Sequence, residues 1–357
     1  MSSATLSGRL AQWAKELRSG TLPVPTVGCI PVERCRPSGS IGQEIEKNEA
    51  YFSIVLNELY LAQGRSWWAA YDPMALVISE FQYGGENVTI PSVVGPAMIK
   101  QKMGQLPHGF VLNDTRATGP YPFRGGNVAV TVILYRVKHQ DYAAGLLRFI
   151  EGVSSAVGAS TEMMTFNKVG AALLDGVNTL LNMRETEPVC GQRVEIDTSD
   201  VEGLRSSHSV LIAQGGIDLR QLWVENRRLR IAGGDAALAP FTSSDYVLYS
   251  ITRTEARGDE EKLPYFDLRM KAVNDALSAD EDRWKRAKAT MLILYEQMLA
   301  SPDLTEKEVG RLFRKYREDL LQKRQDGFDL RAMSEPKDGQ PRALDARLRE
   351  RVALLDL

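Results

Sequence analysis

Residues 74–94 read MALVISEFQYGGENVTIPSVV, and this stretch decides the class of fold. Two runs rich in β-branched and aromatic residues, Met74–Tyr83 and Asn87–Val94, flank the turn sequence Gly84-Gly85-Glu86. Glycine adopts positive φ angles at little steric cost, so a double glycine suits the tight turn between two antiparallel strands. The stretch therefore predicts a β-hairpin.

Three more double glycines, at 125–126, 215–216 and 233–234, accompany short β-branched or aromatic runs elsewhere in the chain. Glycine-rich turns can also bind phosphate when they open a helix and carry the Lys-Ser/Thr of a P-loop. None of the four pairs has that context in the sequence. We expect all four to be structural turns.

Strand-like runs continue on both sides of this hairpin: Tyr51–Leu61, Val128–Tyr135, Val210–Ala213, Leu222–Val224, Leu229–Ile231 and Tyr246–Ile251. The first run is apolar on both alternations, which is typical of a strand buried on both faces and leaves a helix as the alternative. The step Glu225-Asn226-Arg227 between two of the runs has hairpin-turn character. Many short strands favour an antiparallel sandwich over βαβ units. The predicted fold is α+β, with an antiparallel β-sandwich-like core over residues 46–275.

Helices are expected before and within this core. Near residues 141–183, two apolar stripes at helical spacing predict an inserted helical hairpin that covers one face of the sheet. The alternative is a membrane-active hairpin, although Arg148 and Asp175 lie within it. An N-terminal amphipathic helix over residues 4–19, with a proline-rich connector, is expected to occupy residues 1–45.

Two capping-box patterns predict a C-terminal helical extension. Ser278 with Glu281, and Thr305 with Glu308, have the spacing in which a hydroxyl and a carboxylate cap a helix reciprocally. The patterns predict helix starts near residues 279 and 306, and a charged helical pair over residues 278–325.

The predicted helical pair is basic. Between Arg283 and Arg324 there are eleven Lys and Arg against six Asp and Glu, a net charge of about +5. Such a pair can bind nucleic acid or an acidic partner. The alternative is a charged face that is simply solvated.

The last part of the chain predicts a linker and a short helix. Residues 326–341 are polar and contain prolines and glycines, as a linker would. Over residues 342–357, a terminal amphipathic helix is expected, with the stripe Leu344, Leu348, Val352 and Leu355. A short helix after a linker has little core of its own, so we expect it to dock on a partner or on its own chain.

The composition excludes several classes of protein. The 357 residues are 43% hydrophobic and 25% charged, with a net charge of −2, which gives no overall attraction to nucleic acid or anionic membranes. No apolar run reaches the roughly 18–20 residues of a transmembrane helix, and no signal-peptide pattern opens the chain. Cys29, Cys35 and Cys190 lack CxxC spacing and do not suggest a disulfide framework. We expect a soluble, cytoplasmic protein.

Catalytic signatures are missing from the sequence. It contains no P-loop, kinase, HExxH or GxSxG pattern, and we expect neither a cofactor nor a metal. Its three histidines, His108, His139 and His208, are far apart in the chain. Because histidine is the commonest general base at neutral pH, a hydrolase that uses His208 or His139 is the alternative to a non-catalytic protein. Asn113-Asp114 and Asp72 could contribute carboxylates to a metal or acid–base site, or cap ordinary turns.

Two aromatic segments are the candidate partner-binding loops. They contribute Arg65, Trp67, Trp68 and Tyr71 in the first segment, and Tyr121, Phe123 and Arg124 in the second. Trp, Tyr and Arg are the residue types that dominate interface hot spots, although the two tryptophans could instead fold inward. Together with the terminal stripe, these loops predict a non-catalytic adaptor or scaffold component of a multiprotein assembly, which binds protein partners.

Overall fold

The computed structural model of the chain describes residues 24–62, 65–66, 69–95, 110–138, 186–198, 203–233, 237–258, 263, 265–278 and 280–334. The chain forms two compact units: the first comprises Met1–Leu263 and Met298–Arg311, and the second comprises Pro264–Gln297 and Leu312–Leu357.

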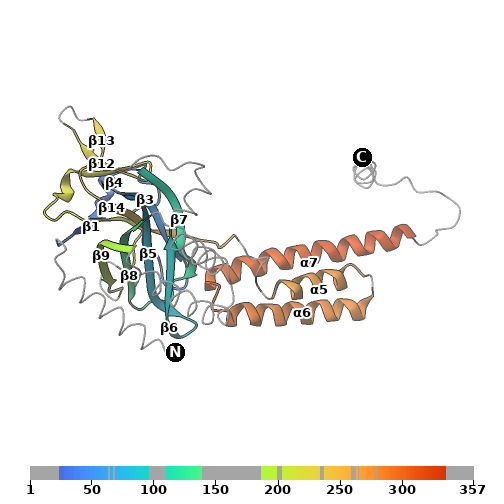
Figure 1. Ribbon diagram of the computed structural model, residues 1–357. Helices are drawn as coiled ribbons and strands as arrows, with labels where there is room; N and C mark the ends of the chain where they lie inside the picture. Colours follow the sequence, from blue (N-terminus) through green and yellow to red (C-terminus); the bar gives the residue numbers. More distant parts are fainter. Residues whose placement is uncertain are drawn as a thin grey trace. The chain divides into compact units, whose positions relative to one another are not determined.

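The elements follow in this order (Figure 1): β1 (Thr26–Ile30), β2 (Cys35–Arg36), β3 (Tyr51–Tyr60), β4 (Arg65–Ser66), β5 (Ala69–Tyr83), β6 (Glu86–Val94), β7 (Phe110–Pro122), β8 (Val128–Lys138), β9 (Thr186–Ile196), β10 (Ser207–Ile212), β11 (Leu222–Glu225), β12 (Arg228–Ala232), β13 (Leu238–Pro240), β14 (Tyr246–Thr254), α5 (Phe266–Ala276), α6 (Glu281–Ala300) and α7 (Glu306–Ser334).

The hairpin predicted from residues 74–94 is confirmed. Strand β5 pairs antiparallel with β6, and Tyr83 lies opposite Glu86 across the turn. Gly84 and Gly85 have φ angles of +61° and +85°, a conformation that suits the turn and strains most side chains. We call the sheet that contains this pair the hairpin sheet. Its strands have the order β4-β5-β8-β9, and β6 pairs with β5 along the edge opposite β8.

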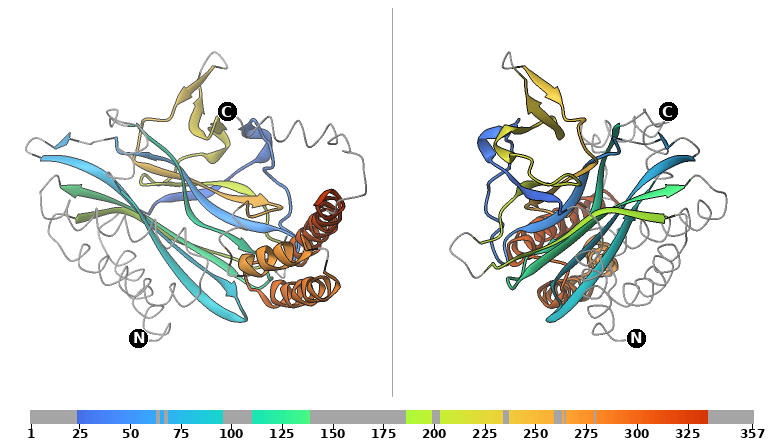
Figure 2. Two further views of the ribbon diagram at one scale, coloured as in Figure 1. Left: turned by 90° about the vertical axis from the view of Figure 1, so that its right-hand side faces the viewer. Right: turned by 60° about the vertical axis from the view of Figure 1, so that its left-hand side comes forward.

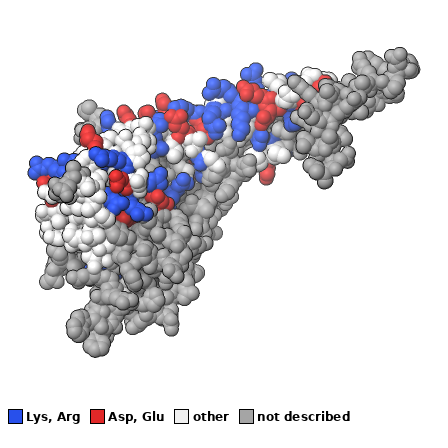
Figure 3. All heavy atoms as spheres, turned by 90° about the horizontal axis from the view of Figure 1, so that it is seen from above, with Lys and Arg blue, Asp and Glu red and all other residues white. Residues whose placement is uncertain are grey.

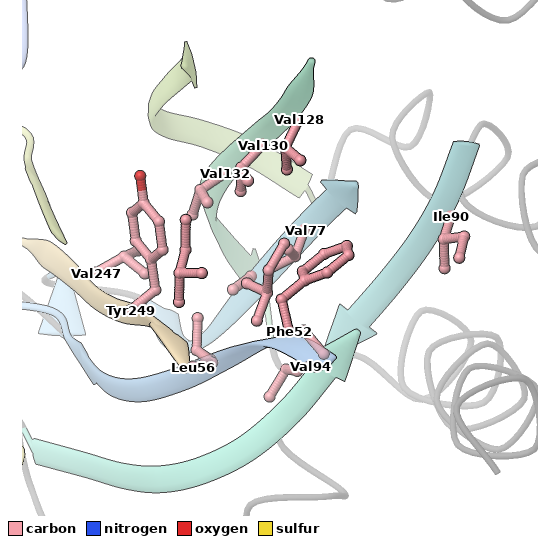
Figure 4. Close-up of a cluster of buried hydrophobic side chains, with 14 of the residues drawn as sticks. Phe52, Leu56, Val77, Ile90, Val94, Val128, Val130, Val132, Val247 and Tyr249 are labelled. Atoms are coloured by element: carbon pink, nitrogen blue, oxygen red, sulfur yellow. The ribbon is translucent and has the colours of Figure 1, made fainter. Parts of the chain in front are cut away.

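A central sheet of order β1-β10-β14-β3-β7 packs against the hairpin sheet. Strand β3 is buried along nearly its whole length, which confirms the strand predicted from its two-sided apolar pattern and excludes the helix. Side chains such as Phe52 and Leu56 from β3 meet Val77 and Val130 of the hairpin sheet in a shared core (Figure 4).

The other face of the central sheet packs against a small sheet, β13-β12-β11-β2. Tyr60 and Leu248 of the central sheet share a second core with Leu229 of the small sheet. In the predicted turn between β11 and β12, Asn226 and Arg227 have φ angles of +51° and +61°. The first unit therefore stacks small, central and hairpin sheets, which confirms the predicted α+β class with a sandwich-like core (Figure 2).

One of the two predicted N-caps is confirmed, and the other is wrong. Thr305 caps α7, because its Oγ1 accepts a hydrogen bond from the Glu308 N–H at 3.1 Å. The reciprocal half of this capping box does not form, because the Thr305 N–H donates to the Tyr51 hydroxyl and the Glu308 carboxylate accepts from Arg311. Helix α6 begins later than expected, because Asp280 takes the place predicted for Ser278. The Asp280 Oδ1 accepts a hydrogen bond from the Asp282 N–H at 2.9 Å.

Helix α5 lies at the end of the segment that we expected to be β-rich, so that boundary was wrong. Only Ala272 and Ala276 are buried in this helix. Two small side chains do not make a periodic stripe in the sequence, and the helix is stabilised by the packing of its neighbours instead.

The expected linker over residues 326–341 begins too early, because α7 continues to Ser334. Gly327, which suggested a break, lies inside the helix. A Cβ at this position would come within 2.2 Å of the Leu277 carbonyl oxygen. The glycine thus permits close packing of α7 on the end of α5. The predicted N-terminal helix, the inserted hairpin near 141–183 and the terminal helix over 342–357 lie outside the described residues.

Candidate functional site

The first predicted loop is described only in part. Arg65 belongs to β4, whose backbone pairs with β5 at Ala70, and Tyr71 lies half-buried on β5. Trp67 and Trp68 lie outside the described residues. The role of this loop in partner binding stays a prediction.

The second predicted loop is part of the core, so the expected exposed recognition surface was wrong there. Tyr121 lies in β7 and Phe123 follows the strand; they are only 7% and 6% exposed. The Tyr121 ring packs against Phe81 and Tyr83, with centroids 5.0 and 5.4 Å apart. Because β7 is an edge strand of the central sheet, it tolerates prolines and continues where the sequence suggested a loop.

Arg124 holds the segment between α6 and α7. Its guanidinium donates hydrogen bonds to the Leu304 carbonyl at 2.6 Å and to the Ser301 carbonyl at 3.4 Å. It also donates to Asn48 Oδ1 at 3.2 Å. These contacts lie within the first unit, and they give Arg124 a structural role in place of the predicted partner contact.

Asp303 is the buried anchor of the same segment. Its Oδ1 accepts hydrogen bonds from Arg257 Nη1 at 2.9 Å and from the Tyr83 hydroxyl at 2.5 Å. Both side chains of the Arg257–Asp303 ion pair are less than a tenth exposed. Nearby, the Thr305 N–H donates to the Tyr51 hydroxyl at 3.2 Å. This network fixes the segment between α6 and α7 on the first unit.

A second polar cluster, the His208 cluster, consists of Asn57, Asp114, His208 and Arg227 and lies on four separate segments. Asn57 sits at a register shift of β3 and donates from Nδ2 to Asp114 Oδ1 at 3.0 Å. Arg227, from the β11–β12 turn, pairs with Asp114 at 3.3 Å. Asp114 has a φ of +33°, and residues with strained backbones cluster at functional sites.

Burial and the charges of the cluster keep His208 neutral at pH 7. The pKa of its imidazole is lowered from 6.5 to about 4, first by burial and then by the charge of Arg227, while the charge of Asp114 opposes the shift. Among the described residues, Nδ1 has no hydrogen-bond partner. A neutral imidazole can accept a proton, as a general base does. The side chain is 6% exposed, however, which limits access to it.

A third arrangement was missed by the sequence analysis: the α6–α7 outer face. It consists of Trp284, Lys288, Leu292 and Tyr295 on α6 and of Phe313, Arg317, Leu321, Arg324 and Phe328 on α7. Successive residues of each set are three or four positions apart in the sequence, which places them on one side of their helix. The signal that could have revealed the face is a second apolar stripe, outside the one that forms the core.

The two stripes of the α6–α7 outer face lie next to each other. At one end the rings of Tyr295 and Phe313 are 4.5 Å apart. At the other end the Arg324 guanidinium lies 5.1 Å from the Trp284 ring and 4.3 Å from the Phe328 ring. Between these ends Leu292 and Leu321 are 58% and 49% exposed, and Phe328 at the second end is 44% exposed.

Cations lie among these apolar residues. The Lys288 ammonium lies over the Trp284 ring at 5.6 Å, and Arg317 is exposed on the neighbouring stripe. Lys and Arg gather over the helices, with Asp and Glu among them (Figure 3). An apolar, aromatic surface with scattered cations suits the binding of a protein segment that carries leucines and carboxylates.

No family model, curated protein or solved structure matches the chain. In the part of the chain that the structure describes, no group of three or more His, Cys, Asp or Glu side chains could hold a metal ion. None of the described helices has both the length and the apolar composition needed to cross a membrane. Of the other predicted site residues, His108 and His139 and the terminal stripe lie outside the described residues.

Proposed function

We propose that this chain is a non-catalytic adaptor or scaffold component of a cytoplasmic multiprotein assembly, and that it binds a protein partner through the α6–α7 outer face. The exposure of Leu292, Leu321 and Phe328 on adjacent stripes carries this proposal. Single exposed leucines are ordinary, but apolar side chains that lie together on a surface mark interaction sites.

The free energy available at such a face is sufficient for specific binding. Burying a leucine or phenylalanine side chain contributes about 1.5–3 kcal/mol. The aromatic residues Trp284, Tyr295 and Phe313 already lie half-buried at the two ends. Aromatic anchors that are held in place cost little conformational entropy when a partner binds.

A protein partner fits the charges better than nucleic acid does. At least seven of the eleven Lys and Arg between Arg283 and Arg324 form ion pairs with Asp or Glu of the same chain. Cations that are already paired release fewer counterions on binding a phosphate backbone. The net charge of about +5 therefore overstates the attraction to nucleic acid.

Substitutions on the outer face test this function. The tagged chain carries a photo-reactive amino acid in place of Lys288, on the same face, and is cross-linked to its partner in its native cells before it is purified together with its assembly. Leu292→Asp with Leu321→Asp is expected to lose the cross-linked partner. Met270→Asp, on α5 and 43% exposed, is the matched control and is expected to retain it.

The fold is checked independently in each variant. All three substitutions replace exposed side chains, so the thermal melting temperature should change little. Equal recovery of the same partner with the outer-face variant and with the Met270→Asp control would rule out this face as the binding site.

The His208 cluster supports a second candidate function, a hydrolase in which His208 is the general base. It rests on a buried, neutral imidazole whose pKa responds to the charges of the Asp114–Arg227 ion pair. The purified chain would be assayed with panels of ester, amide and phosphoester substrates. An activity that both His208→Gln and Asp114→Asn remove, without loss of the fold, would support it. Hydrolysis that survives His208→Gln, or the absence of hydrolysis, would exclude it.

A further inference from the structure

The α6–α7 outer face is long enough to take a helix of about four turns. From Phe313 to Phe328 the stripe on α7 extends for about 22 Å, since a helix rises about 1.5 Å per residue. Aromatic contacts close both ends, and the exposed Leu292 and Leu321 lie between them. An amphipathic helix that binds such a face needs apolar anchors at helical spacing over the same length.

The terminal segment of this same chain carries the required pattern. For residues 342–357, which lie outside the described part, the pattern is read from the sequence. Leu344, Leu348, Val352 and Leu355 recur at i, i+4, i+8 and i+11, the same intervals as the stripe on α6. A helix of this length would extend for about 24 Å, which matches the outer face.

The connection to α7 permits the segment to return along the helix. Helix α7 ends at Ser334, and the next residues include Pro336, Gly339 and Pro341, which cannot continue a helix favourably. Residues 335–341 can extend to about 23 Å, more than the roughly 10 Å width of a helix. Such a reversal would run the segment antiparallel to α7.

The charges are compatible with this placement on one side of the segment. Lys288 and Arg317 lie on the outer face, and neither forms an ion pair with a described carboxylate. By helical periodicity, Asp345 and Asp356 flank one side of the leucine stripe, and Arg347 and Arg351 flank the other. A docked segment can therefore bring its two aspartates toward these cations, with its arginines on the opposite side.

From the matching length, spacing and connection, we infer that residues 342–357 dock in cis on the α6–α7 outer face and compete there with the partner. Attachment through a short connector gives an effective concentration in the millimolar range, so even a weak contact covers the face. The inference deepens the proposed function and rests on it in one respect: the competition exists only if a partner uses this face.

Cysteine cross-linking in the full chain tests the docking. When Leu344 is set beside Phe328, antiparallel packing brings Val352 beside Leu321. The chain carries Leu321→Cys and Val352→Cys, with the exposed Cys29 replaced by Ser; Cys35 and Cys190 are buried. Burial raises the pKa of Cys35 to about 11, so this thiol reacts slowly. Under mild oxidation, the 321–352 disulfide should form at least tenfold faster than in a Met270→Cys control with Val352→Cys.

The outcomes separate the docking from the function. Equal rates for the two pairs would overturn the inference, and so would linking that accelerates with protein concentration, because that identifies a second copy of the chain. If docking holds, Leu348→Asp should increase partner capture severalfold. A fast 321–352 cross-link without any partner would refute the function alone. A partner lost with Leu292→Asp, but no fast cross-link, would refute the docking alone.

Discussion

The two units differ in how completely they cover their apolar side chains. In the first unit, the central sheet is buried on both faces, and strand β3 has almost no exposed side chain. The second unit is much smaller, yet it carries six of the nine exposed large hydrophobic side chains among the described residues.

This difference shows that a charge-rich sequence does not imply a polar surface. The helices of the second unit contain many Lys and Arg, whose long side chains cover apolar surface only in part. Leu292 and Ile293 remain 58% and 47% exposed on α6. The β-rich unit hides nearly all of its apolar residues because each sheet finds another sheet to pack against.

The largest effect is expected at the buried anchor of the first unit. Asp303→Ala should lower the free energy of unfolding of this unit by about 3–5 kcal/mol, because the buried guanidinium of Arg257 would lose this carboxylate. Hydrogen exchange in peptides from β3 measures the change. As a control, Asp282→Ala removes the exposed ion pair with Lys285 and should leave exchange unchanged. Equal effects would show that the anchor is not buried as described.

Adjacent leucines on α6 test the contrast between covered and uncovered positions. Leu294 is fully buried, and Leu294→Ala should lower the free energy of unfolding of the second unit by about 2–4 kcal/mol. In a chain without residues 342–357, Leu292→Ala, at 58% exposure, should change it by less than about 0.5 kcal/mol. Urea denaturation monitored by hydrogen exchange in α6 peptides gives both values. In the full chain Leu292→Ala should have a larger effect, because docking of residues 342–357 covers this leucine. Equal effects of Leu294→Ala and Leu292→Ala in the shortened chain would contradict the contrast between the two positions.

Acid should destabilise the first unit selectively. The pKa of His208 is lowered to about 4 in the folded state, so the unfolded chain takes up this proton first as the pH falls below 6.5. Between pH 7 and pH 5, the free energy of unfolding should therefore fall by about 2 kcal/mol.

Two comparisons isolate this acid effect. His208→Gln should remove this part of the pH dependence in the first unit. The second unit contains no histidine, and its hydrogen exchange should not show the effect. The same pH dependence in both units would contradict the assignment to His208.

The smallest effects are expected at two glycines of α7. Gly327→Ala should lower the free energy of unfolding by about 1–2 kcal/mol, because the new methyl group would meet the Leu277 carbonyl oxygen. Gly310 has no heavy atom within 4 Å of an added Cβ, so Gly310→Ala should raise the free energy of unfolding by up to about 1 kcal/mol. Thermal melting measures both. A stabilising Gly327→Ala would show that α5 and α7 do not pack this closely.

The features predicted correctly from the sequence are those that depend on neighbouring residues. The turn at Gly84-Gly85 and the cap of Thr305 follow from the φ preferences of glycine and from a hydroxyl three residues before a carboxylate. The same local rule failed at Ser278, because Asp280 lies nearer to the free N–H groups of α6.

The candidate sites were less predictable. Tyr121 and Phe123 have the composition of an interface hot spot, yet they fill the core beside Phe81. Asn57, Asp114 and Arg227 are far apart in the chain, and they meet only because β3 pairs with β7 and the small sheet packs on the central sheet. Composition identifies residues that can bind, but it does not tell which of them remain exposed.

By itself, the sequence determined the strands, the tight turns and the stripes of the helices, because side-chain periodicity and backbone preferences act over a few residues. Only the tertiary structure decided that β3 is covered on both faces and that Arg124 holds the segment between the helices. It also decided that the other described residues leave an apolar stripe of α6 and α7 uncovered. The physical reason is that burial depends on which element packs opposite each face, and contacts between distant residues set that arrangement.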